Sequence, residues 1–240
     1  LFAWAMRPIG IWQKICYKKV LFGSLTTLKV LRKKEGHEIE IFDGKGHSCV
    51  AKIVSINSGK TTVQIIGEKS FSPKEGISIF LGQALIKPDA LGFSIQKATE
   101  LGVDSISPLL TERSVTKIKK ESFRKKKEKW LSISQGACEQ CGQNWLPEIN
   151  NPSLLRDWSS SIEAEKKIVL YPGASKKISE IRFTNSVALA IGPEGDFTLE
   201  EIEDLVKEGF TPVSMGTRIL RAETAAISAL STIRTLAGDF

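Results

Sequence analysis

The spacing of apolar and polar residues changes character near residue 72 of this 240-residue chain. Residues 37–56 alternate apolar with polar positions on either side of Asp43-Gly44, a dipeptide typical of a hairpin turn. Residues 61–69 are rich in β-branched side chains, which favour a further strand. The pattern predicts a small β-barrel domain over residues 1–72, because the segment from Ser72 to Gly76 interrupts both periodicities.

From residue 73 onward, expected strands alternate with expected helices. Apolar runs predict strands at residues 77–85, 105–110, 166–172, 186–195 and 211–216. Helical periodicity predicts helices at residues 89–103, 122–141, 198–209 and 222–238. Strands that are apolar throughout and separated by helices indicate a mainly parallel sheet with helices on both faces. Residues 73–240 are therefore predicted to form an α/β domain.

Glycine-bearing loops follow three of these predicted strands. They lie at residues 171–173, 192–196 and 216–223. Because ligands of open parallel sheets bind beyond the carboxyl ends of the strands, these loops are the expected ligand site.

The sharpest single motif is AIGPEGDFTLEE, at residues 190–201. Gly192 and Gly195 flank Pro193-Glu194, which predicts a tight turn from a strand into a helix. Thr198 and Glu201 have the spacing of a capping box, so the helix is expected to begin at Thr198. A structural turn explains part of this motif, but the Gly-Pro-Glu-Gly core goes beyond what a turn requires.

A second motif, MGTRILRAETAA, occupies residues 215–226. Glu223 near the start of the last predicted helix suits the helix dipole. Arg218 and Arg221 lie just before it. They suggest either an anionic substrate such as RNA phosphate or an ion pair with Glu223.

Charge and cysteine content narrow the functional classes. The formal net charge is +7, which favours polyanionic partners, and much of it lies between Lys117 and Lys129. That run has two readings, a solvated helix face or a surface that contacts phosphates. Four cysteines do not make a disulfide scaffold. Cys138 and Cys141 lack a second such pair and a neighbouring histidine, so no metal site is expected.

The amino-terminal stretch LFAWAMRPIG lacks a basic leader and is interrupted by Arg7-Pro8, so it is a poor signal peptide. Met6 is a candidate start of the natural chain. No apolar run approaches the roughly 20 residues that a membrane span needs. We therefore expect a cytoplasmic protein with free thiols and no membrane contact.

Several motifs in a fixed order resemble the ribosomal RNA small subunit methyltransferase E (RsmE) family of the SPOUT class. They are VLRKKEG (30–36), FDGKG (42–46), QKATELGV (96–103), P-x-x-x-ERS (108–114), ACEQCG (137–142), PEI (147–149), IGPEG (191–195) and GTRILRAETA (216–225). The family usually has a second glycine where Asp196 stands and often has arginine where Gln143 stands. These departures bear on the turn and on RNA contacts more than on the fold.

The resemblance implies a SPOUT-type domain over residues 73–240, with a trefoil knot at its carboxyl end, and a PUA-like, RNA-binding barrel over residues 1–72. It also implies a homodimer that methylates N3 of a uridine in 16S ribosomal RNA of the small subunit. S-adenosyl-L-methionine would be held by Tyr171, Pro172, Ile191, Gly192, Pro193, Glu194, Gly195, Met215, Gly216, Arg218, Ile219 and Leu220. The expected RNA contacts are Arg32, Arg113, Lys117, Lys119, Lys120 and Arg124.

The chemistry of the implied reaction points to charged residues of the two carboxy-terminal motifs. Neutral uridine carries a proton on N3, so a base must take it or cations must stabilise the uridine anion. Glu223 and Glu194 are candidate bases, and Arg221 and Arg218 are candidate stabilisers, with Arg221 preferred. Glu223 has a structural reading as well, as a helix-capping or ion-paired residue.

Two rival functions stay open from the sequence. One is another SPOUT methyltransferase that acts on a ribose 2′-oxygen or on guanine. The other is a non-catalytic RNA-binding protein of ribosome assembly that kept the fold.

Overall fold

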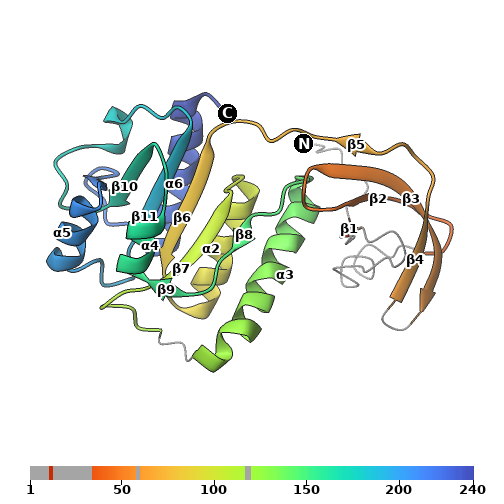
Figure 1. Cartoon of the computed structure of the whole chain (residues 1–240), viewed down its shortest axis with the longest axis horizontal. Coiled ribbons are helices and arrows are strands. Elements are labelled where there is room, and N and C mark those ends of the chain that lie inside the picture. The colour runs from red at the N-terminus through yellow and green to blue at the C-terminus, as the bar shows by residue number, and fades with distance from the viewer. Residues whose placement is uncertain (1–10, 13–33, 58–59, 117–119) are drawn as a thin grey trace. The chain divides into compact units, whose positions relative to one another are not determined.

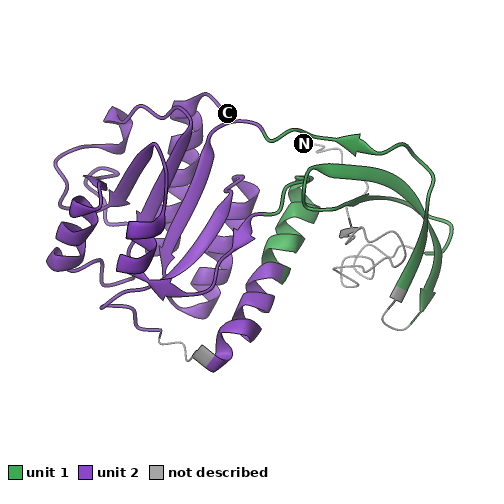
Figure 2. Cartoon of the chain, viewed as in Figure 1, with its two compact units in different colours: residues 1–74, 132–146 green, residues 75–131, 147–240 purple. Residues whose placement is uncertain are grey.

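The computed structural model of the chain describes residues 11–12, 34–57, 60–116 and 120–240 (Figure 1). The chain divides into two compact units (Figure 2). Unit 1 comprises residues 1–74 and 132–146, and unit 2 comprises residues 75–131 and 147–240. Unit 1 thus includes a segment from the middle of the chain in addition to the amino-terminal part.

Unit 1 is built on a five-stranded sheet with the order β1-β2-β3-β4 and with β5 paired to β3. Its strands are β1 (Ile11–Trp12), β2 (Glu38–Phe42), β3 (His47–Asn57), β4 (Lys60–Ile65) and β5 (Ser70–Phe71). Strands β2 and β3 are antiparallel and are joined by a short turn at Asp43-Gly44, which confirms the predicted hairpin. Alternate residues of these strands build a small core of Ile39, Ile41, Ala51 and Ile53.

Unit 2 is built on a seven-stranded sheet whose paired strands are all parallel. Its strands are β6 (Ser78–Ala84), β7 (Ser105–Leu110), β8 (Glu148–Ile149), β9 (Ser153–Leu154), β10 (Lys166–Leu170), β11 (Ser186–Ile191) and β12 (Thr211–Val213). The order is β12-β10-β11-β6-β7-β8, with β9 paired to β7. The predicted parallel α/β sheet is confirmed.

The helices of the described residues agree closely with the periodicity of the sequence. They are α2 (Pro88–Glu100), α3 (Phe123–Cys141), α4 (Leu155–Ser161), α5 (Leu199–Lys207) and α6 (Ala222–Ala237), with 3₁₀ turns η1 (Lys120–Ser122) and η2 (Ile178–Glu180). The pattern did not predict α4, because its seven residues span only two turns. Within the described residues, no helix combines the length and apolar character that a membrane crossing needs.

Helices cover both faces of the unit 2 sheet, and successive residues of its central strands are therefore buried. Along β11, the five positions from Val187 to Ile191 are all buried. Ala188 and Ala190 face a cluster with Trp158 of α4 and Leu205 of α5. The alternate positions face the opposite side, where α6 packs against both β11 and α2.

One buried side chain, Arg234 of α6, joins three segments of unit 2. Its Nη1 donates to the carbonyl of Ile77 at 2.9 Å and to Oδ2 of Asp239 at 2.7 Å. Its Nε donates to the carbonyl of Leu101 at 3.0 Å, and its Nη2 donates to the carbonyl of Gly102. The guanidinium therefore fastens the last helix to the start of β6 and to the turn after α2.

Replacing Arg234 with alanine should lower the free energy of unfolding by about 3–5 kcal/mol, because Asp239 would lose its ion pair and three carbonyls would lose a donor in a region largely shielded from water. Chemical denaturation at neutral pH measures this. The matched variant Arg124→Ala removes a guanidinium whose side chain is 91% exposed, and it should change stability little. An equal, small loss in both variants would contradict the structural role of Arg234.

Candidate functional site

A cavity of about 580 Å³ opens at the carboxyl ends of β10, β11 and β12, where the three glycine-bearing loops meet. Besides the loops, it is lined by Lys87 and Ala90 at the start of α2 and by Ala222, Glu223 and Ala225 of α6. Eleven of the twelve residues expected to hold a cofactor line this cavity, and so do Arg221 and Glu223. Gly195 is the exception.

The β11–α5 turn is a compact structure that a half-buried carboxylate, Asp196, helps to hold. Asp196 lies in the left-handed region with φ 59°, and its N–H donates to the carbonyl of Pro193 at 3.0 Å. Its Oδ1 accepts the N–H of Phe197 at 2.8 Å. Gly192 is confined by the same turn, since a β-carbon there would lie 3.1 Å from Oδ1 of Asp196. Aspartate tolerates the left-handed region better than most residues, so it can replace a glycine here.

Helix α5 begins as the sequence predicts. Thr198 accepts the N–H of Glu201 at 3.1 Å, and Oε2 of Glu201 accepts the N–H of Thr198 at 2.9 Å. The capping box is therefore present, and it sets the direction in which the chain leaves the turn.

Glu194 has a structural task that the sequence did not reveal. Its Oε1 accepts the backbone N–H of Lys87, which precedes α2, at 3.1 Å. Backbone N–H groups at a helix start lack partners within the helix, so a carboxylate from another loop can satisfy one of them. Glu194 thus connects the β11–α5 turn to the helix on the far side of the cavity, which makes it a less suitable free base than Glu223.

The loop after β7 is fastened by one hydrogen bond to the same turn and by another to the first turn of α5. Arg113, expected from the sequence to contact RNA, donates from Nη1 to the carbonyl of Gly195 at 3.0 Å. Oε1 of Glu201 accepts the N–H of Glu112 at 2.9 Å. Arg113 therefore supports the turn from outside the cavity.

The β12–α6 loop presents charged residues at the mouth of the cavity. Arg218 and Arg221 are exposed, and Ile219 is 82% exposed. Arg221 is the residue before α6, and Glu223 lies in the first turn of that helix. Within the described part of the chain, no ion pair joins either arginine to Glu223, so the paired arrangement considered from the sequence is absent.

The deep wall of the cavity is apolar. Leu170, Ile191, Val213 and Ala222 are buried there, each at the end of a strand or the start of a helix. Lys87, Arg218 and Arg221 supply cationic groups, and Glu194, Asp196 and Glu223 supply carboxylates. A cavity with apolar walls and a few convergent polar groups can orient an amphipathic small molecule.

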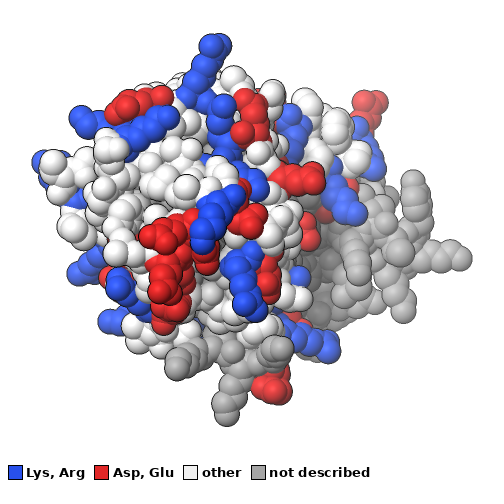
Figure 3. Space-filling view, turned by 60° about the vertical axis from the view of Figure 1, so that its left-hand side comes forward, with Lys and Arg blue, Asp and Glu red and all other residues white. Residues whose placement is uncertain are grey.

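The basic run expected to contact RNA is only partly described. Arg32, Lys117 and Lys119 lie outside the described residues, and for Lys120 only the backbone, in η1, is described. Arg124 is exposed on α3 and forms an ion pair with Glu128, 3.1 Å from Nε to Oε1. Figure 3 shows acidic side chains gathered in the middle of one face with basic ones around them. On that face, the positive charge does not form one continuous patch.

Of the two cysteines of α3, Cys138 is buried and serves packing, whereas Cys141 is exposed. The Sγ of Cys138 donates to the carbonyl of Trp145 at 3.4 Å. Burial raises the pKa of the Cys138 thiol well above its usual range. Among the described residues, no group of three or more histidine, cysteine, aspartate or glutamate side chains could hold a metal ion.

Lys87 and Ala90 are lining residues that the sequence motifs did not identify. A signal for them was present, because they follow strand β6 and residues after parallel strands share one edge of the sheet. The order of strands was needed to place β6 directly beside β11.

Asp196→Asn should raise the melting temperature at neutral pH. Burial raises the pKa of Asp196, with Glu201 nearby adding to the shift, so the ionised carboxylate weakens the folded state above that pKa. The difference between the two proteins should vanish as the pH falls below 3.8, the ordinary value, since Asp196 is then protonated in both states. Asparagine tolerates the same backbone geometry and can still accept the Phe197 N–H.

Thermal unfolding followed across a pH series gives both curves for the Asp196→Asn comparison. The control Asp204→Asn removes an exposed carboxylate 2.6 Å from Nζ of Lys207 and should give no such gain at neutral pH. A gain at position 196 that persists unchanged at acid pH would contradict the electrostatic cause.

Comparison with known proteins identifies both parts of the chain. The RNA methyltransferase domain family matches residues 50–234, and the RNA methyltransferase PUA domain family matches residues 28–66. A curated relative, ribosomal RNA small subunit methyltransferase E of Buchnera aphidicola (strain Sg), is 39% identical over 213 residues, which cover 88% of this chain and 87% of that protein.

Solved structures agree with these matches. A methyltransferase of Legionella pneumophila in complex with the cofactor SAM is 37% identical, with a TM-score of 0.88 over 95% of this chain and 98% of that one. Ribosomal RNA small subunit methyltransferase E of Neisseria gonorrhoeae, bound to S-adenosyl methionine, is 30% identical, with a TM-score of 0.81 over 89% of each chain.

The resemblance found in the sequence motifs is therefore confirmed, and so is the PUA domain expected at the amino end. The matches extend over both units, since they cover 88% to 95% of this chain. The chain belongs to the ribosomal RNA small subunit methyltransferase E family.

Proposed function

We propose that the protein transfers the methyl group of S-adenosyl-L-methionine to N3 of a uridine in 16S ribosomal RNA. The observation that carries this proposal is the cavity that unites the two carboxy-terminal motifs at one edge of the unit 2 sheet. Family membership supports methylation of ribosomal RNA. The uridine and its N3 atom follow from the sequence resemblance.

The residues of the cavity fit S-adenosyl-L-methionine. A volume of about 580 Å³ lies in the range of small-molecule sites. The buried walls formed by Leu170, Ile191 and Val213 suit the adenine ring, and nearby carboxylates suit the positive charge of a sulfonium. When bound, the cofactor supplies an activated methyl group, so the main task of the protein is alignment.

The proposed cofactor-binding residues all line the cavity except Gly195. They are Tyr171, Pro172, Ile191, Gly192, Pro193, Glu194, Met215, Gly216, Arg218, Ile219 and Leu220. Gly195 contributes indirectly, since its carbonyl accepts the hydrogen bond from Arg113 that supports the turn.

Arg221 is the proposed stabiliser of the reacting base. It is exposed at the cavity, and as the residue before α6 its backbone is extended, with φ −62° and ψ 152°. A fixed guanidinium near the uracil oxygens would favour the N3 anion. Glu223 follows two residues later, in the first turn of α6, and lines the same cavity. It can accept the N3 proton or serve the helix dipole, and within the described residues no ion pair ties its carboxylate to Arg218 or Arg221.

Two further features are part of the proposal. A trefoil knot at the carboxyl end is supported by hydrogen bonds between the β10–β11 connection and the segment that leads to α6: Ser214 donates to Lys176 at 2.8 Å, and Ile178 donates to Ser214 at 3.0 Å. A homodimer is supported by the exposure of Ile219 at the cavity mouth, where a second subunit would cover it. Ribosomal RNA as substrate also supports a cytoplasmic location.

The test of the function is methyl transfer from labelled S-adenosyl-L-methionine to small ribosomal subunits that lack the modification, followed by mass spectrometry of RNA digests. We expect one methylated uridine with the label on N3. A label on a ribose 2′-oxygen or on guanine would favour another SPOUT activity. A lack of cofactor binding in calorimetry would favour the non-catalytic alternative.

Arg221→Ala should reduce kcat by roughly 10²–10³-fold, because a group that stabilises charge only in the transition state is lost. The Kd for S-adenosyl-L-methionine should stay nearly unchanged. Single-turnover methylation and calorimetric titration measure the two quantities separately.

The matched control for Arg221 is Arg156→Ala, which removes an exposed arginine of α4 that does not line the cavity. It should leave both kcat and cofactor affinity as they are. Unchanged turnover in Arg221→Ala would reject the role assigned to this residue.

A further inference from the structure

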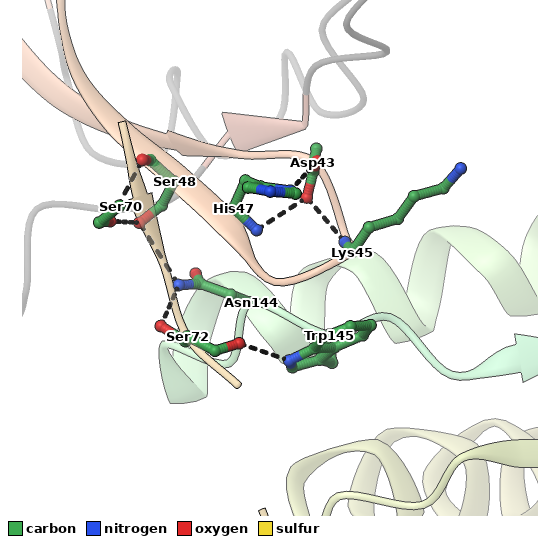
Figure 4. Close-up of polar contacts among 8 residues, drawn as sticks. All are labelled: Asp43, Lys45, His47, Ser48, Ser70, Ser72, Asn144 and Trp145. Carbon is green, nitrogen blue, oxygen red and sulfur yellow. Dashed lines mark hydrogen bonds and ion pairs between the residues drawn. The ribbon is translucent and has the colours of Figure 1, made fainter. Parts of the chain in front are cut away.

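The hairpin turn between β2 and β3 in unit 1 is held by the side chain of Asp43 (Figure 4). One carboxylate oxygen accepts hydrogen bonds from the backbone N–H of Lys45 at 2.7 Å and from that of His47 at 3.0 Å. The other oxygen lies 2.9 Å from Nδ1 of the His47 ring. Burial by itself would raise the pKa of Asp43, but these hydrogen bonds lower it below its ordinary value. The ionised carboxylate can only accept, so Nδ1 of His47 carries a proton and the ring is fixed in its plane.

Beside this ring lies a short row of aromatic side chains that are distant in sequence. The ring centroids of His47 and Phe71 are 4.9 Å apart, and those of Phe71 and Trp145 are 6.1 Å apart in a T-shaped arrangement. The indole Nε1 of Trp145 donates to the carbonyl of Ser72 at 2.9 Å, which fixes that ring in turn. The row is a preformed surface, because each outer ring is held by a hydrogen bond.

Gly46 allows these rings to lie against the turn. Its φ is 91°, and a β-carbon there would lie 2.7 Å from the Trp145 ring and 2.8 Å from the Phe71 ring. The backbone N–H of Gly46 donates to the carbonyl of Asn144 at 3.0 Å. The turn and the segment before Trp145 are therefore joined at this point within unit 1.

The central ring of the row is open to solvent. Phe71 is 56% exposed although it has aromatic neighbours on two sides, and the side chain of His47 is 36% exposed. A ring that served the core alone would be buried, as Ile39 and Ile41 of the same unit are. The aromatic row thus ends in a free surface centred on Phe71.

Two lysines belong to the segments next to this surface, and the backbone of one, Lys45, pairs with that of Trp145. Lys45 is exposed and extends away from the turn (Figure 4). Nζ of Lys74, also exposed, lies 5.5 Å from the centroid of the Trp145 ring. Exposed rings with lysines beside them are the combination by which proteins hold single-stranded RNA, the rings stacking on bases and the cations meeting phosphates. An apolar protein partner would not need the two cations.

We propose that Phe71, between His47 and Trp145, stacks on an unpaired base of the RNA, while Lys45 and Lys74 contact the neighbouring phosphates. This inference rests on the proposed function in one respect, that the substrate is RNA. Beyond the RNA-binding barrel that the resemblance implies, it names the aromatic row as the place where a base is held, outside the cavity and outside the basic run of residues 117–129. Because every base has a π-face, the site tolerates different sequences.

The test compares Phe71→Leu, which keeps an apolar side chain without a π-face, with Phe71→Trp, which keeps the π-face. The probe is a fluorescein-labelled octamer of single-stranded oligouridine, titrated at fixed salt. Phe71→Leu should raise its Kd roughly tenfold, the loss expected for one stacked base. Phe71→Trp should bind as the parent does. A second octamer with one 2-aminopurine should lose fluorescence on binding the parent protein and much less on binding Phe71→Leu.

Controls separate stacking from damage to the fold. Phe240→Leu changes an exposed phenylalanine of unit 2 and should leave RNA affinity unchanged. Melting temperature and calorimetric affinity for S-adenosyl-L-methionine should be the same in the parent and in both Phe71 variants. Equal affinity of Phe71→Leu and the parent would overturn the proposal, and so would an equal loss in both Phe71 variants.

Methyl transfer by the parent protein distinguishes this proposal from the proposed function. If the parent methylates small subunits and Phe71→Leu binds the octamer normally, only the stacking site is wrong. If the parent binds the octamer through Phe71 but methylates nothing, the stacking site stands and the proposed function fails.

Discussion

Arg234 occupies the point at which three parts of unit 2 meet, and the position of the candidate site depends on it. Its guanidinium joins α6 to the residue before β6 and to the turn after α2, and Asp239 balances its charge. Asp239 also accepts the N–H of Ile77 at 3.0 Å. Position 76 must be glycine for this contact, because a β-carbon there would collide with the Asp239 carboxylate. Since Arg221 and Glu223 stand at the opposite end of α6, a fixed helix axis fixes their place at the cavity.

The cavity itself is held together by contacts that cross from one loop to another. Glu194 reaches the start of α2, Arg113 reaches the carbonyl of Gly195, and Glu201 both caps α5 and accepts the N–H of Glu112. Each hydrogen bond satisfies a backbone group that its own element leaves unpaired. These polar side chains thus serve mainly to fix the positions of the loops relative to one another. The apolar wall and the exposed arginines remain for ligands.

The two units contribute different kinds of surface. Unit 2 offers a cavity of defined volume with apolar walls, which suits a small molecule. Unit 1 offers an exposed aromatic ring between two fixed rings, with lysines beside it, which suits a flexible polyanion. A methyltransferase that acts on one base of a large RNA benefits from both kinds of surface. One surface aligns the reacting atoms, and the other binds the surrounding RNA.

Much of this protein could be predicted from sequence because the information is local. The β2–β3 hairpin follows from alternation around Asp43-Gly44, and the start of α5 follows from the Thr198–Glu201 spacing. The parallel sheet follows from apolar strands that alternate with helices. These features depend on residues a few positions apart, where propensity and pattern are informative. The twelve expected cofactor residues came instead from the family resemblance, and eleven of them line one cavity.

Only the tertiary structure decided which distant residues meet. It assigned Glu194 to the N–H of Lys87, Arg113 to Gly195, and Lys87 to the cavity, and it brought Phe71 against Trp145. It also added α4, whose Trp158 packs on a face that needed the strand order to be known. The physical reason is that such contacts depend on strand order and on packing between elements, and the periodicity of a single segment determines neither of them.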